Sequence, residues 1–252
     1  MACDNPLMET AEFIETLARE GALLADAAES AGLDAPVPTC PDWRVRDLVL
    51  HTGAVHRWAA SYVAERRMDR GGFDTSGPQD AELVDWYRQT HLRLVGALTD
   101  APADLACWYF LAAPSPLEFW ARRQAHETTV HRADAEAALG PDPSPVDPAF
   151  AANGVDELLA GFHARKRSQV RTDRPRTLRV RTEDVPGGDW LVHLSTEPPR
   201  TERGVPGPAD CEVSAPAVDL YLALWNRGPY DGLSVRGDGS LVELWRRTSA
   251  VG

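Results

Sequence analysis

The sequence predicts an α+β protein in which an N-terminal four-helix bundle precedes a small α+β domain. Helical apolar periodicity dominates the first part of the chain, and short strand-like runs appear only in the last third. Between them lies a stretch with four prolines in eight residues, residues 141–148, which is typical of a stiff linker. At 252 residues the chain exceeds a typical single domain. We therefore expect a bundle at residues 1–140, a linker at 141–148 and a second domain at 149–252.

Four long helices are expected before the linker. They cover about residues 8–31, 44–67, 79–98 and 116–140. Gly32 and the prolines after it end the first helix, and Pro116 is placed where proline is accepted, in a first helical turn. Such a bundle can build a metal site from side chains that point inward.

The last third mixes both kinds of element. The expected elements are a helix at about 149–167, strands at 177–182, 189–195, 211–214 and 233–236, a helix at 216–226, and a closing helix around Leu241, Leu244 and Trp245. This mixture predicts a small α+β domain.

Composition excludes several classes of protein. The net charge of −12 argues against nucleic-acid binding, which requires clustered Lys and Arg. The longest apolar runs are too short for a membrane span, and no secretory signal is visible. The cysteines are scattered, with no C-x-x-C pair: Cys3, Cys40, Cys107 and Cys211. We therefore expect a cytoplasmic protein without a disulfide scaffold, and the single lysine beside abundant arginine and alanine suggests a high-GC bacterial source.

The most informative stretch surrounds Glu127 and His131. Residues four apart on a helix leave the same face, so this carboxylate and imidazole can share one metal ion. His51, on an earlier helix, offers a third ligand. Two histidines and one carboxylate with open positions are typical of a catalytic metal site. Taken alone, however, a helical Glu-x-x-x-His pair is more often a surface hydrogen bond or ion pair.

Helical geometry separates the remaining histidines from this group. His126 lies about 100° from Glu127 around the helix, and His56 lies about 140° from His51, so neither is expected to join the same centre. We expect His51 to be buried among apolar neighbours and His56 to lie toward solvent or a pocket rim. His91, His163 and His193 are assigned no role.

Two further residues near the predicted site have open interpretations. Asp134 follows His131 by three residues and could orient it, or it could pair with a neighbouring arginine. Cys40 is interpreted as a small structural residue, because no base is near it in sequence. No dinucleotide, P-loop, serine-hydrolase or H-E-x-x-H motif is present.

These motifs resemble those of the mycothiol-dependent maleylpyruvate isomerase family. Residues 39–51 (TCPDWRVRDLVLH) are similar to its N-terminal signature, and residues 122–136 (RRQAHETTVHRADAE) to its second signature. The tail, at 218–227 and 233–238, resembles its sterol-carrier-protein-like C-terminal domain.

The resemblance implies a DinB-like bundle that binds a divalent metal, with zinc expected, through His51, Glu127 and His131. It also implies a low-molecular-weight thiol, mycothiol, as cofactor or co-substrate. Arg227 matches the arginine that assists catalysis in that family, although an arginine at a helix end can also simply cap carbonyls. Ligand type alone permits zinc, iron, nickel or cobalt.

Together these observations predict a monomeric enzyme in which the metal activates the thiol for addition to an electrophile. Elimination after rotation would isomerise a maleylpyruvate-like acid from cis to trans, and Arg227 would bind a substrate carboxylate or enolate. Two alternatives stay open: a mycothiol S-transferase acting on a metabolite or toxic electrophile, and a non-catalytic protein that binds metal or thiol. An iron oxygenase fits less well, because that chemistry usually occurs in a β-barrel.

Overall fold

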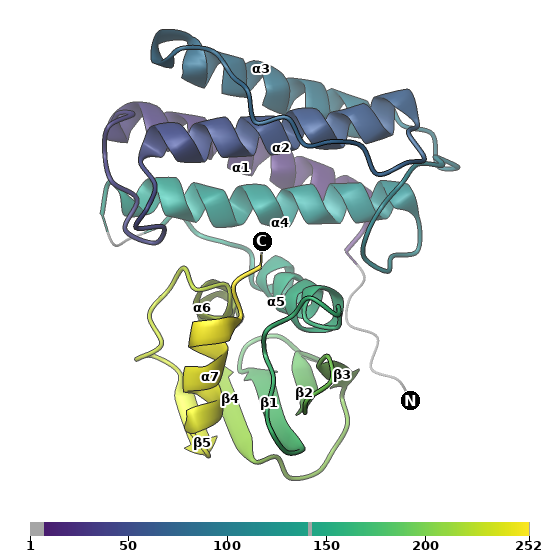
Figure 1. Ribbon diagram of the computed structural model, residues 1–252, viewed down its shortest axis with the longest axis vertical. Coiled ribbons are helices and arrows are strands. Elements are labelled where there is room, and N and C mark those ends of the chain that lie inside the picture. Colours follow the sequence, from purple (N-terminus) through teal and green to yellow (C-terminus); the bar gives the residue numbers. More distant parts are fainter. Residues whose placement is uncertain (1–7, 141–142, 252) are drawn as a thin grey trace. The chain divides into compact units, whose positions relative to one another are not determined.

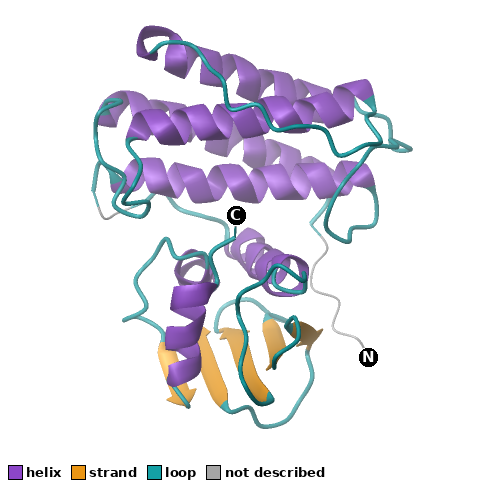
Figure 2. Cartoon of the chain, viewed as in Figure 1, coloured by secondary structure: helices purple, strands orange, loops and turns teal. Residues whose placement is uncertain are grey.

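The computed structural model describes residues 8–140 and 143–251, and the predicted linker residues Pro141 and Asp142 lie outside these ranges. The chain divides into two compact units, Glu9–Ser144 and a second that begins at Pro145. The first unit is helical and the second contains a five-stranded sheet (Figure 2), so the predicted α+β class is confirmed. No helix of the described residues is long and apolar enough to cross a membrane.

The first unit is a bundle of four long helices (Figure 1). They are α1 (Thr10–Ala31), α2 (Val45–Glu65), α3 (Asp80–Thr99) and α4 (Pro116–Ala137). Helix α1 packs mainly on α4 and α3, and α2 packs mainly on α3 and α4, so consecutive helices α1 and α2 lie diagonally across the bundle. Each helix begins and ends within about three residues of its predicted limits.

Local sequence explains where the helix that bears two predicted ligands begins. The hydroxyl of Ser115 accepts a hydrogen bond from the backbone N–H of Glu118 at 3.1 Å, and Pro116 occupies the first turn. From there α4 is almost continuously buried through Ala135. A helix that is buried on nearly all sides has its side chains fixed by neighbours, which suits the construction of a site.

The second unit is a mixed sheet with short helices. Its elements are α5 (Pro148–Asp156), a π-helical continuation (Glu157–Phe162), β1 (Arg176–Thr182), β2 (Asp189–Leu194), β3 (Arg200–Arg203), β4 (Cys211–Ala215), α6 (Ala217–Leu224), β5 (Ser234–Gly237) and α7 (Ser240–Thr248). The strand order is β3-β2-β1-β4-β5. Only the β1–β4 pair is parallel, and the other neighbours are antiparallel.

Two predictions about the second unit were wrong. The helix expected at 149–167 changes to π-helical geometry at Glu157 and ends at Phe162. Strand β3 was not predicted, because its residues, RTER, lack the alternation of apolar and polar residues that indicates a strand. An edge strand that pairs on one side only, here with β2, can form from such polar residues.

Candidate metal centre

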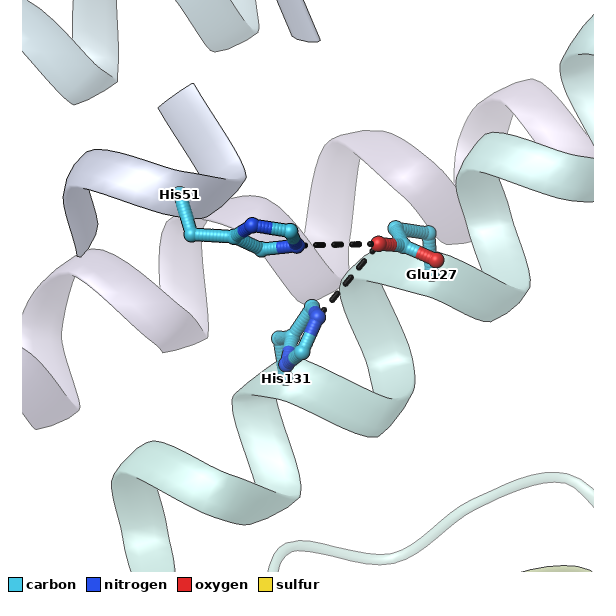
Figure 3. A group of neighbouring side chains, drawn as sticks. All are labelled: His51, Glu127 and His131. Carbon is cyan, nitrogen blue, oxygen red and sulfur yellow. Dashed lines mark ion pairs between the residues drawn. The ribbon is translucent and has the colours of Figure 1, made fainter. Parts of the chain in front are cut away.

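Helices α2 and α4 bring His51, Glu127 and His131 together (Figure 3). The Nε2 atoms of both histidines face the same carboxylate oxygen, Oε1 of Glu127, at 3.5 Å for His51 and 3.3 Å for His131. One ligand atom from each residue lies within 4.8 Å of the other two. The predicted group of three is therefore a cluster in space as well as a pattern in sequence.

The separations between these atoms fit a single metal ion. Zinc binds histidine nitrogen and carboxylate oxygen at about 2.0–2.2 Å, and two ligands at a tetrahedral angle are then about 3.4 Å apart. The two separations from Oε1 of Glu127, 3.3 and 3.5 Å, are close to that value. Both are slightly longer than a typical hydrogen bond, and they are compatible with three ligand atoms around one ion.

The second carboxylate oxygen of Glu127 has a different partner. Arg123, one helical turn earlier on α4, places Nη2 3.1 Å from Oε2, and its side chain is almost fully buried. Glu127 thus directs one oxygen toward the histidines and the other toward a buried cation. This division favours binding of a metal through one oxygen.

Asp134 lies behind His131 on α4. Its Oδ2 is 2.8 Å from Nδ1 of His131, and the aspartate is fully buried. Of the two interpretations left open by the sequence, this contact supports orientation of the ligand. A histidine whose Nδ1–H binds a carboxylate presents the lone pair of Nε2 to a metal.

Neighbouring charges shift the pKa values of Glu127 and His131. Burial alone would raise the pKa of Glu127, but His131, His51 and Arg123 together hold it well below its usual value. Burial alone would lower the pKa of His131, but Asp134 and Glu127 raise it to about 9. In the absence of metal, a proton on His131 takes the place that a cation would occupy, because both satisfy the same carboxylates.

The structure corrects the expected burial of the two histidines of α2. The side chain of His51 is 31% exposed, whereas His56 is fully buried and its Nε2 lies 2.8 Å from Oγ1 of Thr128. Both faces of α2 are apolar in sequence, so neighbouring leucines could not indicate which histidine enters the core. His51 is the histidine of α2 that joins Glu127 and His131 in the cluster, but the burial argument that favoured it was wrong.

Sequence reasoning missed several neighbours of the ligands. The indole of Trp43 lies 5.0 Å from the ring of His51 and 5.9 Å from that of His131, and Phe73 meets His51 edge-on at 6.3 Å. Thr39 donates to Asp134, and Cys40 approaches it at 3.8 Å. Contacts such as Thr39–Asp134, 95 residues apart, leave no periodic signal in a single sequence.

Arg227 lies in the second unit, just after α6. The chain turns there through Asn226, whose φ is +58°, and Nη1 of Arg227 donates to the backbone carbonyl of Trp225 at 2.9 Å. The capping role that the sequence left open is thus present. A role for Arg227 in catalysis stays a prediction.

Comparisons with known proteins cover nearly all of the chain. The mycothiol maleylpyruvate isomerase N-terminal domain model matches residues 14–136, and the MDMPI C-terminal domain model matches residues 149–244. A crystal structure of the mycothiol-dependent maleylpyruvate isomerase is similar with a TM-score of 0.62 at 12% identity, covering 90% of this chain and 93% of that one.

A second solved structure, a histidine-to-alanine mutant of that isomerase, is similar with a TM-score of 0.61 at 11% identity and the same coverage. At these identities the structural likeness shows a shared fold. No curated protein sequence matches the chain.

Proposed function

The chain belongs to the mycothiol maleylpyruvate isomerase family, and from that membership we propose that it is a metal-dependent enzyme that activates mycothiol for addition to an electrophile. The preferred reaction is cis–trans isomerisation of a maleylpyruvate-like acid. The observation that supports this most strongly is the cluster of His51, Glu127 and His131, whose donor separations suit one four-coordinate ion with a position left for a thiol.

The residues present suit zinc, with two imidazoles and one carboxylate as ligands. When bound, such a cation would stabilise the thiolate form of a thiol, whose free pKa is near 8.5, at neutral pH. The low pKa of Glu127 keeps its carboxylate ionised. Arg123 donates a hydrogen bond to Oε2 of this carboxylate, so Oε1 is the oxygen that is left for the metal. Asp134 keeps the Nδ1 proton of His131 away from the ligand position.

Isomerisation then needs no net oxidation or reduction. The thiolate sulfur adds to one carbon of the cis double bond, and the electron pair of that bond moves to the conjugated carbonyl oxygen, which gives an enolate. The former double bond is now single and can rotate. Return of the electron pair expels the same thiolate and leaves the trans acid. We propose that Arg227 binds a carboxylate or the enolate oxygen of the substrate through its guanidinium fork.

The decisive experiment measures metal content and maleylpyruvate turnover with mycothiol for the wild type and for His51→Ala, Glu127→Ala and His131→Ala. We expect about one metal per chain in the wild type and loss of both metal and turnover in each variant. His193→Ala, on β2 in the other unit, is the control and should keep both. Metal without maleylpyruvate turnover would favour S-transfer or a binding role, and a reconstituted wild type without metal would refute the proposed site.

One observation favours S-transfer as a second candidate. Phe73 is 44% exposed and lies between the exposed ligand His51, at 6.3 Å, and Trp58, at 5.9 Å. Trp58 in turn contacts Trp108 and Trp120. An aromatic cluster whose exposed member, Phe73, lies beside the proposed ligand His51 suits an electrophile with an apolar group. Mass analysis of products would separate the candidates, because a transferase leaves a stable thioether and an isomerase returns the thiol.

A further inference from the structure

We propose that Thr39 and Asp134 are positioning residues for the metal site, which together fix the orientation and the proton position of the ligand His131. This inference rests on the proposed function in one respect, namely that His131 is a metal ligand. It concerns how the bundle and the loop before α2 hold that ligand in place.

Asp134 uses both carboxylate oxygens. Its Oδ2 is 2.8 Å from Nδ1 of His131, and its Oδ1 accepts a hydrogen bond from the hydroxyl of Thr39 at 2.5 Å. The aspartate is fully buried. Because buried polar oxygens are costly to leave unsatisfied, the Thr39 hydroxyl satisfies Oδ1 of Asp134 and restricts rotation of the carboxyl group.

The loop that supplies Thr39 is held by its own backbone. The N–H of Val37 donates to the carbonyl of Trp43 at 3.0 Å, and the N–H of Cys40 donates to the carbonyl of Val37 at 3.0 Å. A β-bridge joins Pro36 to Arg44 at the base of the loop. Thr39 is therefore a fixed donor that anchors Asp134 from outside its own helix.

The same loop restrains His131 a second time. The indole of Trp43 stacks on the imidazole of His131, with an interplanar angle of 28° and a centroid separation of 5.9 Å. Stacking restricts tilt of the ring, whereas the hydrogen bond to Asp134 fixes its rotation in the plane. Together they leave Nε2 of His131 directed toward Oε1 of Glu127.

Fixing the ring also fixes the tautomer. A carboxylate can only accept, so neutral His131 must keep its proton on Nδ1 and present a bare Nε2. Without Thr39, Oδ1 of Asp134 loses a donor and the carboxylate can turn away from the imidazole. Outer partners of this kind typically change metal affinity by about 10–100-fold when they are removed.

The test compares four variants. Asp134→Ala removes the carboxylate, Thr39→Val removes only the hydroxyl, and Thr39→Ser restores a hydroxyl. The matched control is Thr90→Val on α3, which removes a buried hydroxyl that binds the backbone carbonyl of Tyr87 in its own helix. Zinc affinity is measured by competition with a chelator, and ring ¹⁵N NMR reports which nitrogen of His131 bears the proton.

We expect zinc affinity to fall by about 10–100-fold in Asp134→Ala and by about tenfold in Thr39→Val. Thr39→Ser and Thr90→Val should stay close to the wild type. The Nδ1–H form should predominate at His131 in the wild type and become mixed with the Nε2–H form in Thr39→Val. Equal affinity and an equal tautomer ratio in Thr39→Val and the wild type would overturn the inference, as would an equal loss of affinity in Thr90→Val.

Failure of the proposed function is distinguishable from failure of this inference. If the wild type binds neither zinc nor iron, nickel or cobalt, the metal site is refuted, and the ¹⁵N spectra are compared in metal-free protein at a pH high enough to deprotonate His131. A mixed tautomer population confined to Thr39→Val and Asp134→Ala would still support positioning, and its absence would refute it.

Discussion

The bundle contains two pairs of histidines that are alike in spacing and opposite in character. In the site pair, His51 and His131, the ring centroids are 5.1 Å apart. In the core pair, His56 and His91, they are 5.3 Å apart. Helix α2 supplies one member of each pair. Proximity of two imidazoles therefore does not decide which pair suits a metal.

The partners of the two pairs differ. Both site histidines face Glu127, and His131 also binds Asp134. The core pair has neutral partners instead, because Nε2 of His56 meets the hydroxyl of Thr128 and Nε2 of His91 meets the carbonyl of Ala18.

Electrostatics follow these partners. Burial is the main cause that lowers the pKa of both core histidines, whereas carboxylates raise the pKa of His131 to about 9 although it is buried too. Two buried imidazoles without an anion stay neutral and act as hydrogen-bonding core groups. A carboxylate beside them creates the charge balance that a divalent cation needs. The neighbouring anion, and not the proximity of two imidazoles, therefore distinguishes the pair that we propose as metal ligands from the core pair.

The largest expected effect is on zinc affinity, and it separates two adjacent residues of α4: one contacts the site pair and the other contacts the core pair. Glu127→Gln removes the anion of the site pair and should weaken zinc binding by at least the roughly 10–100-fold of an outer-partner loss. Thr128→Val removes the partner of His56 and should leave zinc affinity unchanged, while lowering the free energy of unfolding by about 1–3 kcal/mol because a buried nitrogen loses its hydrogen bond. Chelator competition and urea unfolding measure both effects.

A reversal of this pattern would break the comparison. If Thr128→Val weakened zinc binding as much as Glu127→Gln did, the core pair would belong functionally to the site. If Glu127→Gln kept wild-type affinity, the anion would not be the deciding group.

Sequence could predict the cluster of proposed ligands better than the surroundings of that cluster. Glu127 and His131 lie on one helix, so their i, i+4 spacing predicts that both side chains leave the same face. The family motifs added His51. The burial of His51 and His56 could not be settled, because α2 packs on two neighbours and both of its faces are apolar. The anchoring of Asp134 by Thr39 depends on a loop closing onto α4, which only the tertiary structure reveals.

The core pair also predicts a pH effect on stability. In the folded protein the pKa of His56 lies well below its ordinary 6.5, first because of burial and then because of His91. Below about pH 6.5 the unfolded chain therefore binds a proton that the folded protein does not. The free energy of unfolding then decreases as the pH is lowered, by at most about 1.4 kcal/mol per pH unit for one histidine. His56→Gln should make this slope shallower in metal-free protein.

The difference between wild type and variant isolates His56 in this experiment. His163, in the second unit, contributes with the same sign, because burial and nearby Arg171 lower its pKa to about 4. Urea unfolding between about pH 5 and 6.5 measures the slopes. An unchanged slope in His56→Gln would mean that His56 is charged in the folded core, contrary to the comparison.

The last prediction concerns how the core pair is held, and it includes the smallest single effect, that of Gly96→Ala. A Cβ at Gly21 of α1 would lie 2.2 Å from Cε1 of His91, whereas a Cβ at Gly96 of α3 would meet no atom within 4 Å. Alanine is favoured over glycine in a helix by about 1 kcal/mol, so Gly96→Ala should raise the free energy of unfolding by up to that amount. Gly21→Ala should lower it by about 1–3 kcal/mol, because the ring of His91 must leave the carbonyl of Ala18.

Zinc affinity should stay unchanged in both glycine variants, since neither contacts the site pair. A stabilised Gly21→Ala protein would show that His91 moves at little cost, and the core pair would then be an accident of packing. A destabilised Gly21→Ala protein with wild-type zinc affinity would separate the two pairs completely. The core pair would then be held by close packing for the fold, and the site pair would be held by carboxylates for chemistry.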